Sequence, residues 1–207
     1  MKKKLLNLKN MIVVVTKNHS AEEIRNLYEM GFHVFGENRM QELKTKLNVY
    51  MPEARWHFIG HLQTNKVRDA VRYCDMIQSV DSEKLLLKID EEAKRQGKIM
   101  DVLLQINIAE EDTKYGFRYD EVEDIVKQYY GLSNLRIRGI MVIGPHTDDR
   151  KRIAEVFHKG KVLFDKLESN YQHIRYLSMG MSSDYEIALE EGSNMLRLGR
   201  IMFDDDF

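Results

Sequence analysis

Short apolar runs alternate with amphipathic stretches along most of the chain. Met11–Thr16 is a β-branched run bounded by polar residues, which is typical of a buried strand. Ala21–Met30 then carries apolar residues at helical spacing, with Ser20 as a candidate N-cap and Gly31 as a stop. Glu23, three residues after Ser20, completes a capping box. The pattern therefore predicts a strand followed by a helix.

The same unit recurs to the end of the chain. Further strands are predicted at His33–Phe35, Trp56–Ile59, Met76–Val80, Val102–Ile108, Ile137–Ile143, Ile174–Ser178 and Met195–Met202. Further helices are predicted at Arg39–Leu47, Asn65–Tyr73, Glu83–Gln96, Tyr119–Tyr129, Lys151–Ser169 and Asp184–Glu191. Eight strands alternating with seven helices indicate right-handed crossovers and a parallel sheet, whose simplest closed form is a (β/α)₈ TIM barrel. The rival, an open doubly wound sheet, lacks its Gly-rich loop here, because Lys17-Asn18-His19 follows the first strand.

Composition adds bounds to this α/β fold. The 207 residues are 43% hydrophobic and 31% charged, as in a globular protein of one domain over residues 1–207. Lys and Arg (32) nearly balance Asp and Glu (33), which argues against nucleic acid as a partner. No apolar run approaches the roughly 20 residues that cross a bilayer, so we expect no membrane partner. The single cysteine, Cys74, indicates a reducing cytoplasm and is interpreted as a core residue rather than a reactive thiol.

Polar residues gather where the predicted strands end, at the face of the barrel that carries sites in this fold. Lys17 directly follows the first strand, and a lysine desolvated there offers an amine that adds to an aldehyde. By position alone, a surface lysine in a loop is the favoured reading of Lys17. Gly199 lets backbone N–H groups approach an anion, Arg200 adds charge, and Ser182 opens a helix. Arg197, inside an apolar strand, fits a ligand site or a salt bridge equally well.

No metal site is expected. His57 and His61 are four residues apart, as in a helical metal pair, but the residues between them form a strand and a turn. Lys66, Arg68 and Arg72 are interpreted as a solvated helix face.

Several of these segments together resemble one family. They are Thr16-Lys17, the stretch from Phe35 to Glu42 (FGENRMQE), the stretch from Trp56 to Lys66 (WHFIGHLQTNK), the stretch from Leu177 to Asp184 (LSMGMSSD) and Gly192-Ser193 with the stretch from Met195 to Gly199 (MLRLG). In this order and spacing, from about residue 11 to residue 203, the chain resembles the pyridoxal 5′-phosphate (PLP) homeostasis proteins, also called the YggS or PROSC family. The resemblance implies a barrel like the amino-terminal domain of alanine racemase, of fold type III among PLP proteins.

The resemblance also implies a cofactor site and a role. PLP would form a Schiff base with Lys17, Arg197 would face the pyridine nitrogen, Ser182, Gly199 and Arg200 would hold the phosphate, and Asn38 and His57 would line the site. Proteins of this kind act in intracellular PLP (vitamin B6) homeostasis, are thought to deliver PLP to apoenzymes, and have no established turnover. The resemblance favours a monomer and leaves the oligomeric state open. The expected protein is therefore a carrier without catalytic residues.

Physical reasoning favours this carrier. An arginine has no acceptor for a pyridinium proton, so opposite the ring nitrogen it makes PLP a poor electron sink. The racemases take a second acid/base from a carboxy-terminal β domain, whereas this chain ends at Phe207. A weak amino-acid racemase is the alternative, with Tyr115 or His146 as base. A phosphate-binding barrel with another ligand and no imine is a third reading.

Two departures from the family pattern bear on PLP retention. Relatives have a longer helix before the first strand, of which Met1–Asn10 is a shortened form. Relatives also often carry a small hydroxyl residue at the position of Arg200.

Overall fold

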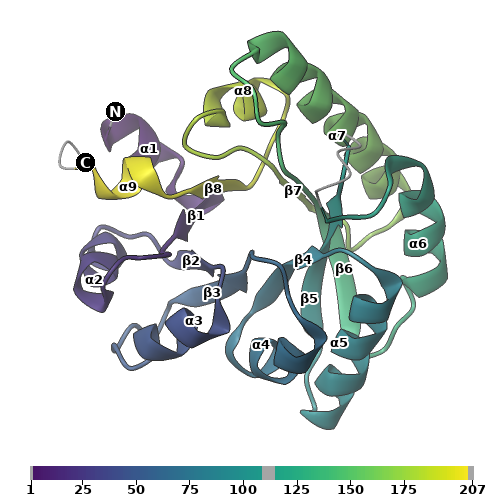
Figure 1. Cartoon of the computed structure of the whole chain (residues 1–207), viewed down its shortest axis with the longest axis horizontal. Helices are drawn as coiled ribbons and strands as arrows, with labels where there is room; N and C mark the ends of the chain where they lie inside the picture. The colour runs from purple at the N-terminus through teal and green to yellow at the C-terminus, as the bar shows by residue number, and fades with distance from the viewer. Residues whose placement is uncertain (1, 109–114, 205–207) are drawn as a thin grey trace.

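Eight parallel strands form one sheet that curves into a barrel (Figure 1). The structure is a computed structural model, and it describes residues 2–108 and 115–204. The strand order is β7-β6-β5-β4-β3-β2-β1-β8. The strands are β1 Ile12–Val15, β2 Val34–Glu37, β3 Arg55–Phe58, β4 Met76–Val80, β5 Met100–Ile106, β6 Leu135–Val142, β7 Tyr176–Ser178 and β8 Leu196–Leu198. The predicted (β/α)₈ barrel is confirmed.

Helices surround the strands, as Figure 1 shows. The helices are α1 Lys2–Asn7, α2 Ala21–Glu29, α3 Met40–Lys46, α4 Val67–Tyr73, α5 Glu83–Arg95, α6 Val122–Tyr129, α7 Arg150–Asn170, α8 Tyr185–Glu190 and α9 Arg200–Phe203. Short 3-10 turns lie at Lys9–Met11, Thr64–Lys66 and Tyr119–Glu121. Among the described residues, no helix is long and apolar enough to cross a membrane. The helix predicted within Met1–Asn10 is α1, and Met1 lies outside the described residues.

The two end strands of the sheet meet and close the barrel. Ser178 and Met195 form an isolated parallel bridge between the β7 and β8 segments. Met179 N donates to Met195 O at 3.1 Å, and Arg197 N donates to Gly180 O at 2.9 Å. Because β8 also pairs with β1, the β8 segment lies between the first strand and the seventh strand and completes the ring.

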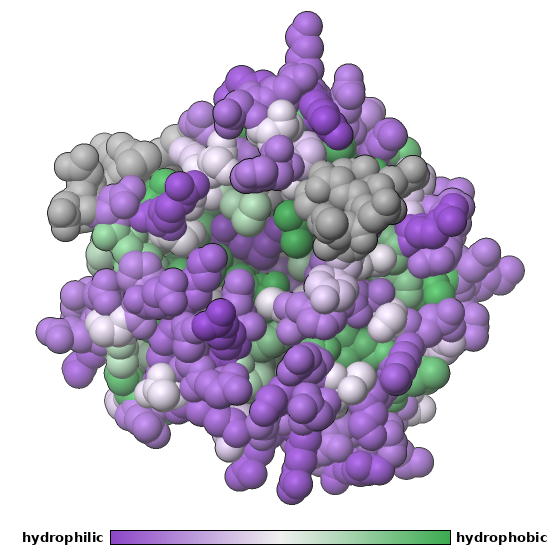
Figure 2. Space-filling view, viewed as in Figure 1, coloured by the Kyte–Doolittle hydropathy of each residue, from purple (hydrophilic) through white to green (hydrophobic). Residues whose placement is uncertain are grey.

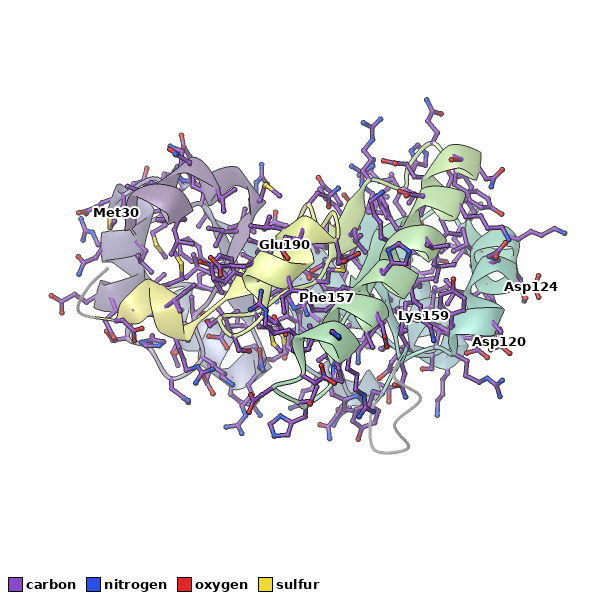
Figure 3. All side chains as sticks on the ribbon, turned by 90° about the horizontal axis from the view of Figure 1, so that it is seen from above. Met30, Asp120, Asp124, Phe157, Lys159 and Glu190 are labelled. Carbon is purple, nitrogen blue, oxygen red and sulfur yellow. The ribbon has the colours of Figure 1, made fainter. Side chains whose placement is uncertain are left out.

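Side chains on the strands alternate between two cores. Ile12 and Val14 of β1 belong to the large apolar cluster between strands and helices. Val13 belongs instead to a small cluster in the barrel interior, with Met76, Leu103, Met141 and Met195. The helices bury one face only: Phe157 of α7 is fully buried, whereas Lys159, two residues later, is exposed (Figure 3). Polar side chains cover most of the face in Figure 2, and apolar side chains show mainly near the barrel axis and between helices.

The predicted carboxyl-terminal end of the eighth strand was wrong. The prediction ran to Met202, but β8 stops at Leu198 and Gly199 caps a short helix, Arg200–Phe203. The helix turns Met202 inward, where it is 1% exposed. Two neighbouring apolar residues satisfy a buried strand and one helical turn alike, so the sequence pattern did not separate them. Cys74 is buried, as predicted, and burial raises the pKa of its thiol.

Candidate functional site

The loops after β6 and β7 enclose a cavity of about 750 Å³ at the carboxyl ends of the strands. His146 lies in the first of these loops, Met181 and Ser183 lie in the second, and Arg200 completes the wall. This is the face at which TIM barrels build their sites. We call this space the mouth cavity.

Lys17 lies in the turn directly after β1 and is exposed. Thr16 N donates to Gly36 O at 3.0 Å, and Asn18 then takes the left-handed region with φ 64°. Within the described part of the chain, the Lys17 ammonium makes no hydrogen bond or ion pair. Its amine is therefore accessible to a ligand.

The predicted phosphate residues come together beside β1. Gly199 N donates to Ser182 Oγ at 3.3 Å. A Cβ on Gly199 would lie 3.4 Å from Val15 Cβ, so this loop lies against the end of the strand that leads to Lys17. Arg200 is exposed and lines the mouth cavity. The structure thus groups Ser182, Gly199 and Arg200 next to the Lys17 turn.

Arg197 is a buried cation. Its Nη1 donates to the carbonyl and the hydroxyl of Ser178, both at 2.8 Å, and its Nη2 donates to Val142 O at 2.9 Å. Burial lowers the pKa of Arg197 to about 10, and Asp184 opposes this shift. Burial likewise raises the pKa of the Asp184 carboxyl. Arg197 remains protonated at neutral pH.

A chain of hydrogen bonds continues from Arg197 across the barrel interior. Ser178 Oγ donates to Gln78 Oε1 at 2.7 Å, and Gln78 Nε2 lies 2.9 Å from His57 Nδ1. Because an arginine can only donate, Ser178 accepts from it and donates onward, and Gln78 donates to His57. Burial lowers the pKa of His57 to about 4, so this imidazole is neutral and carries its proton on Nε2.

His57 lies away from the mouth cavity. It lines a second cavity of about 360 Å³ at the amino-terminal ends of the strands, with apolar neighbours that include Val13, Val34 and Met76. The sequence grouped His57 with the cofactor residues, whereas the structure connects it to Arg197 only through Ser178 and Gln78.

Asn38 follows β2 and carries a buried oxygen that lacks a partner. Its Oδ1 accepts no hydrogen bond within the described residues, and the fully buried Ser79 Oγ at the end of β4 has none either. Asn38 lines a cavity of about 330 Å³ with Gly60 and His61. A Cβ on Gly60 would lie 2.3 Å from Asn38 O, so only glycine fits there. A hydrogen-bond donor on a ligand, or an ordered water, would satisfy these buried oxygens.

Sequence reasoning missed several polar residues of this region. Gln78 and Ser178 link Arg197 to His57, and Lys46 forms a buried ion pair with Glu37. A polar residue inside an apolar strand was the available signal for Gln78. Lys46 gave no signal, because it lies on a helix among other lysines.

The residues considered for metal binding or for a racemase base do not form one site: His57 and His146 line different cavities, and His61 and Tyr115 line neither of these two. The described residues contain no group of three or more potential metal ligands. His61 pairs with Asp81 at 3.0 Å and stacks on Tyr115, with ring centroids 3.8 Å apart. Tyr115 and His146 are both exposed, and of the two only His146 lines the mouth cavity.

Comparison with known proteins identifies the family. The family model described as "Alanine racemase, N-terminal domain" matches residues 1–206. The pyridoxal phosphate homeostasis protein of Helicobacter pylori is 40% identical over 196 residues, or 93% of this chain and 86% of that protein. That of Escherichia coli K12 is 33% identical, over 93% of this chain and 84% of that protein.

Solved structures agree. PipY of Synechococcus elongatus PCC7942, with PLP bound, has a TM-score of 0.87 and 33% identity and covers 97% of this chain and 98% of its own. Alanine racemase of Clostridium difficile 630 has a TM-score of 0.78 at 18% identity, over 97% of this chain and 54% of its own, which supports the fold alone. The chain belongs to the alanine racemase N-terminal domain family and, within it, to the pyridoxal phosphate homeostasis proteins.

Proposed function

We propose that this protein binds PLP at the carboxyl-terminal end of its barrel, through an imine with Lys17, and acts in PLP homeostasis. The observation that carries the proposal is the exposed Lys17 turn beside the paired Ser182 and Gly199. A relative at 33% identity, PipY, was solved with PLP bound. A lysine amine near the hydroxyl and backbone donors of Ser182 and Gly199 matches the aldehyde and the phosphate of this cofactor.

The Ser182–Gly199 pair fits the phosphate. A hydroxyl, a backbone N–H without a side chain in the way, and the Arg200 guanidinium are donors of the kind that phosphate oxygens accept. Asn38, with its unsatisfied oxygen, would line the same end of the barrel. His57 would act at a distance, through Gln78 and Ser178.

Arg197 supports a carrier without turnover. Bound PLP supplies an electron sink, which is strongest when its ring nitrogen is protonated. Arg197 offers donors alone, so opposite that nitrogen it would keep the nitrogen unprotonated. Its contacts to Ser178 and Val142 fix the guanidinium in the barrel interior. In this proposal residues 1–207 form one PLP-binding domain, a cytoplasmic monomer that transfers PLP to apoenzymes.

A PLP titration followed by absorbance tests the binding site. The wild-type protein is expected to give a band near ~420 nm, where imines of this cofactor absorb. Lys17→Met should abolish the band, whereas Lys159→Met, a change of an exposed lysine on α7, should retain it. An equal band in Lys17→Met and wild type would overturn the assignment of the imine.

Proton exchange tests the absence of turnover. Alanine and serine are incubated in deuterated water with the PLP-loaded protein. The proposal expects no exchange at the α-carbon above that of free PLP. Exchange that depends on Lys17, and that His146→Ala or Tyr115→Phe removes, would establish the racemase alternative instead.

A further inference from the structure

Side chains from the β2–α3 region hold the backbone on both sides of Lys17. Lys46 Nζ donates to Thr16 O at 2.6 Å. Thr16 Oγ1 donates to Glu37 Oε1 at 2.6 Å. On the other side of Lys17, Asn18 N donates to Glu42 Oε2 at 3.2 Å. Residues 16 and 18 are therefore both bonded to side chains of α3, and Thr16 is bonded to β2 as well.

These three holding residues form a connected charged cluster. Lys46 pairs closely with Glu37 and lies 3.9 Å from a carboxylate oxygen of Glu42. The Glu37 side chain is 0% exposed and that of Lys46 is 6% exposed, whereas that of Glu42 is 27% exposed. A buried ion pair costs so much desolvation that it rarely stabilises a fold more than apolar packing would. A pair retained there fits a role in fixing local geometry.

The segment that the cluster holds needs external support. Asn18 occupies the left-handed region, which non-glycine residues adopt at a cost. The β1 strand ends at Val15, and one further backbone bond to β2 runs from Thr16 N to Gly36 O, before Lys17. Besides the backbone bond from His19 N to Thr16 O, the side-chain bonds to Thr16 and Asn18 therefore restrict the conformation of the Lys17 turn.

We propose that Glu37, Glu42 and Lys46 are positioning residues that hold the Lys17 turn so that its amine meets the carbonyl carbon of PLP. The inference rests on the proposed function. The amine nitrogen forms the C=N bond, and the carbonyl oxygen leaves as water with the two amine hydrogens. The cluster contributes geometry alone, because a small misplacement of a nucleophile slows such a step.

Two ligands separate positioning from general damage to the site. PLP carries an aldehyde, whereas pyridoxine 5′-phosphate has an alcohol there and forms no imine. The rate of imine formation is measured by stopped-flow absorbance with PLP. The affinity for pyridoxine 5′-phosphate is measured by calorimetry in the same variants.

Lys46→Met is compared with Lys44→Met, the same change two residues earlier on α3. Lys44 is exposed and pairs with Asp69. We expect Lys46→Met to slow imine formation about tenfold or more, while pyridoxine 5′-phosphate affinity stays within about twofold of wild type. Lys44→Met should match wild type for both ligands.

Glu42 gives a second comparison that keeps both members of the buried Glu37–Lys46 pair. Glu42→Ala removes the acceptor of Asn18 N, whereas Glu42→Gln keeps an oxygen there. We expect Glu42→Ala to slow imine formation and Glu42→Gln to restore most of the rate. Because Glu42 is partly exposed, this pair decides the question even if Lys46→Met does not fold.

The outcomes are distinct. Rates of imine formation equal to wild type in both Lys46→Met and Glu42→Ala would overturn the inference. So would an equal fall in the rate with PLP and in the affinity for pyridoxine 5′-phosphate. If wild-type protein itself forms no imine on Lys17, the proposed function fails and the inference with it. If the wild type forms the imine and the Lys46→Met and Glu42→Ala variants form it at the same rate, the inference fails and the proposed function stands without it.

Discussion

At the scale of single residues, the barrel interior is ordered by one cation. Arg197 donates to Ser178, and this fixes the direction of each bond through Gln78 to the Nδ1 atom of His57. His57 is buried and its pKa falls from 6.5 to about 4. A proton on Nδ1 would face the donor on Gln78. This series of hydrogen bonds therefore opposes protonation of His57, as burial does.

The folded state should therefore lose stability on mild acidification. The folded pKa of His57 lies below the unfolded value, so the unfolded chain binds more protons between pH 6.5 and 4. The stability that neutral His57 contributes is present above 6.5 and is lost as the pH falls toward 4. From pH 7 to pH 5 we expect a loss of about 2 kcal/mol in the free energy of unfolding from this residue.

Urea unfolding at the two pH values measures that loss. His57→Gln should show a smaller drop between pH 7 and pH 5 than wild type, whatever its stability at pH 7. His146→Gln changes an exposed histidine and should keep the wild-type drop. Identical drops in His57→Gln and wild type would show that His57 does not titrate as assigned.

The sequence predicted part of the candidate site. Lys17, Ser182, Gly199 and Arg200 follow strands, and the carboxyl ends of parallel strands in a barrel always meet, so their grouping was predictable. The depth at which a side chain lies within the barrel could not be predicted in the same way. It depends on strand register and stagger, and these place His57 near the opposite end.

At the scale of elements, local signals determine where α2 begins. Glu23 N donates to Ser20 Oγ at 3.3 Å, and Ser20 N donates to Glu23 Oε2 at 2.7 Å. Hydrogen bonds from His19 and Ser20 lower the pKa of Glu23 from 4.5 to about 2. The predicted capping box is confirmed. It holds the helix that follows the Lys17 turn.

Removing this cap should have a modest cost. Ser20→Ala leaves the Glu23 N–H without its side-chain acceptor and is expected to lower the free energy of unfolding by about 1 kcal/mol. Urea denaturation measures the change. Ser133→Ala, in an exposed turn, is the control and should have little effect. Equal midpoints for the two variants would contradict the role of the cap.

Strand–helix alternation was predictable because each unit has its own period and its own stop signal. The end of β8 was not, because Leu198, Ile201 and Met202 suit a strand and a short helix equally. The extension of β2 to Glu37 was missed for a different reason. A glutamate ends an apolar run in the sequence, and its burial depends on distant partners, Thr16 and Lys46, that the local pattern does not show.

At the scale of the whole molecule, the barrel depends on close backbone contact between β6 and β7. Gly139 of β6 is paired with Tyr176 of β7 and has φ 151°. A Cβ at this position would lie 1.9 Å from Tyr176 O. Since β7 bridges to the β8 segment at Met195, this contact lies next to the closure of the ring.

Gly139→Ala is expected to destabilise the fold by about 3 kcal/mol or more, because backbone rather than a flexible side chain blocks the new methyl group. Guanidinium denaturation measures the loss. Gly131→Ala, where a Cβ would meet nothing within 4 Å, is the matched control. A Gly139→Ala protein as stable as Gly131→Ala would contradict this account of the closure.

The central claim is that PLP forms its imine with Lys17, and reductive trapping tests this claim most directly. PLP-treated protein is reduced with borohydride, digested and mapped by mass spectrometry. The account predicts one pyridoxyl label, on the peptide that carries Lys17. A label spread over exposed lysines such as Lys159, or one that persists on the Lys17→Met protein at the same yield, would contradict it.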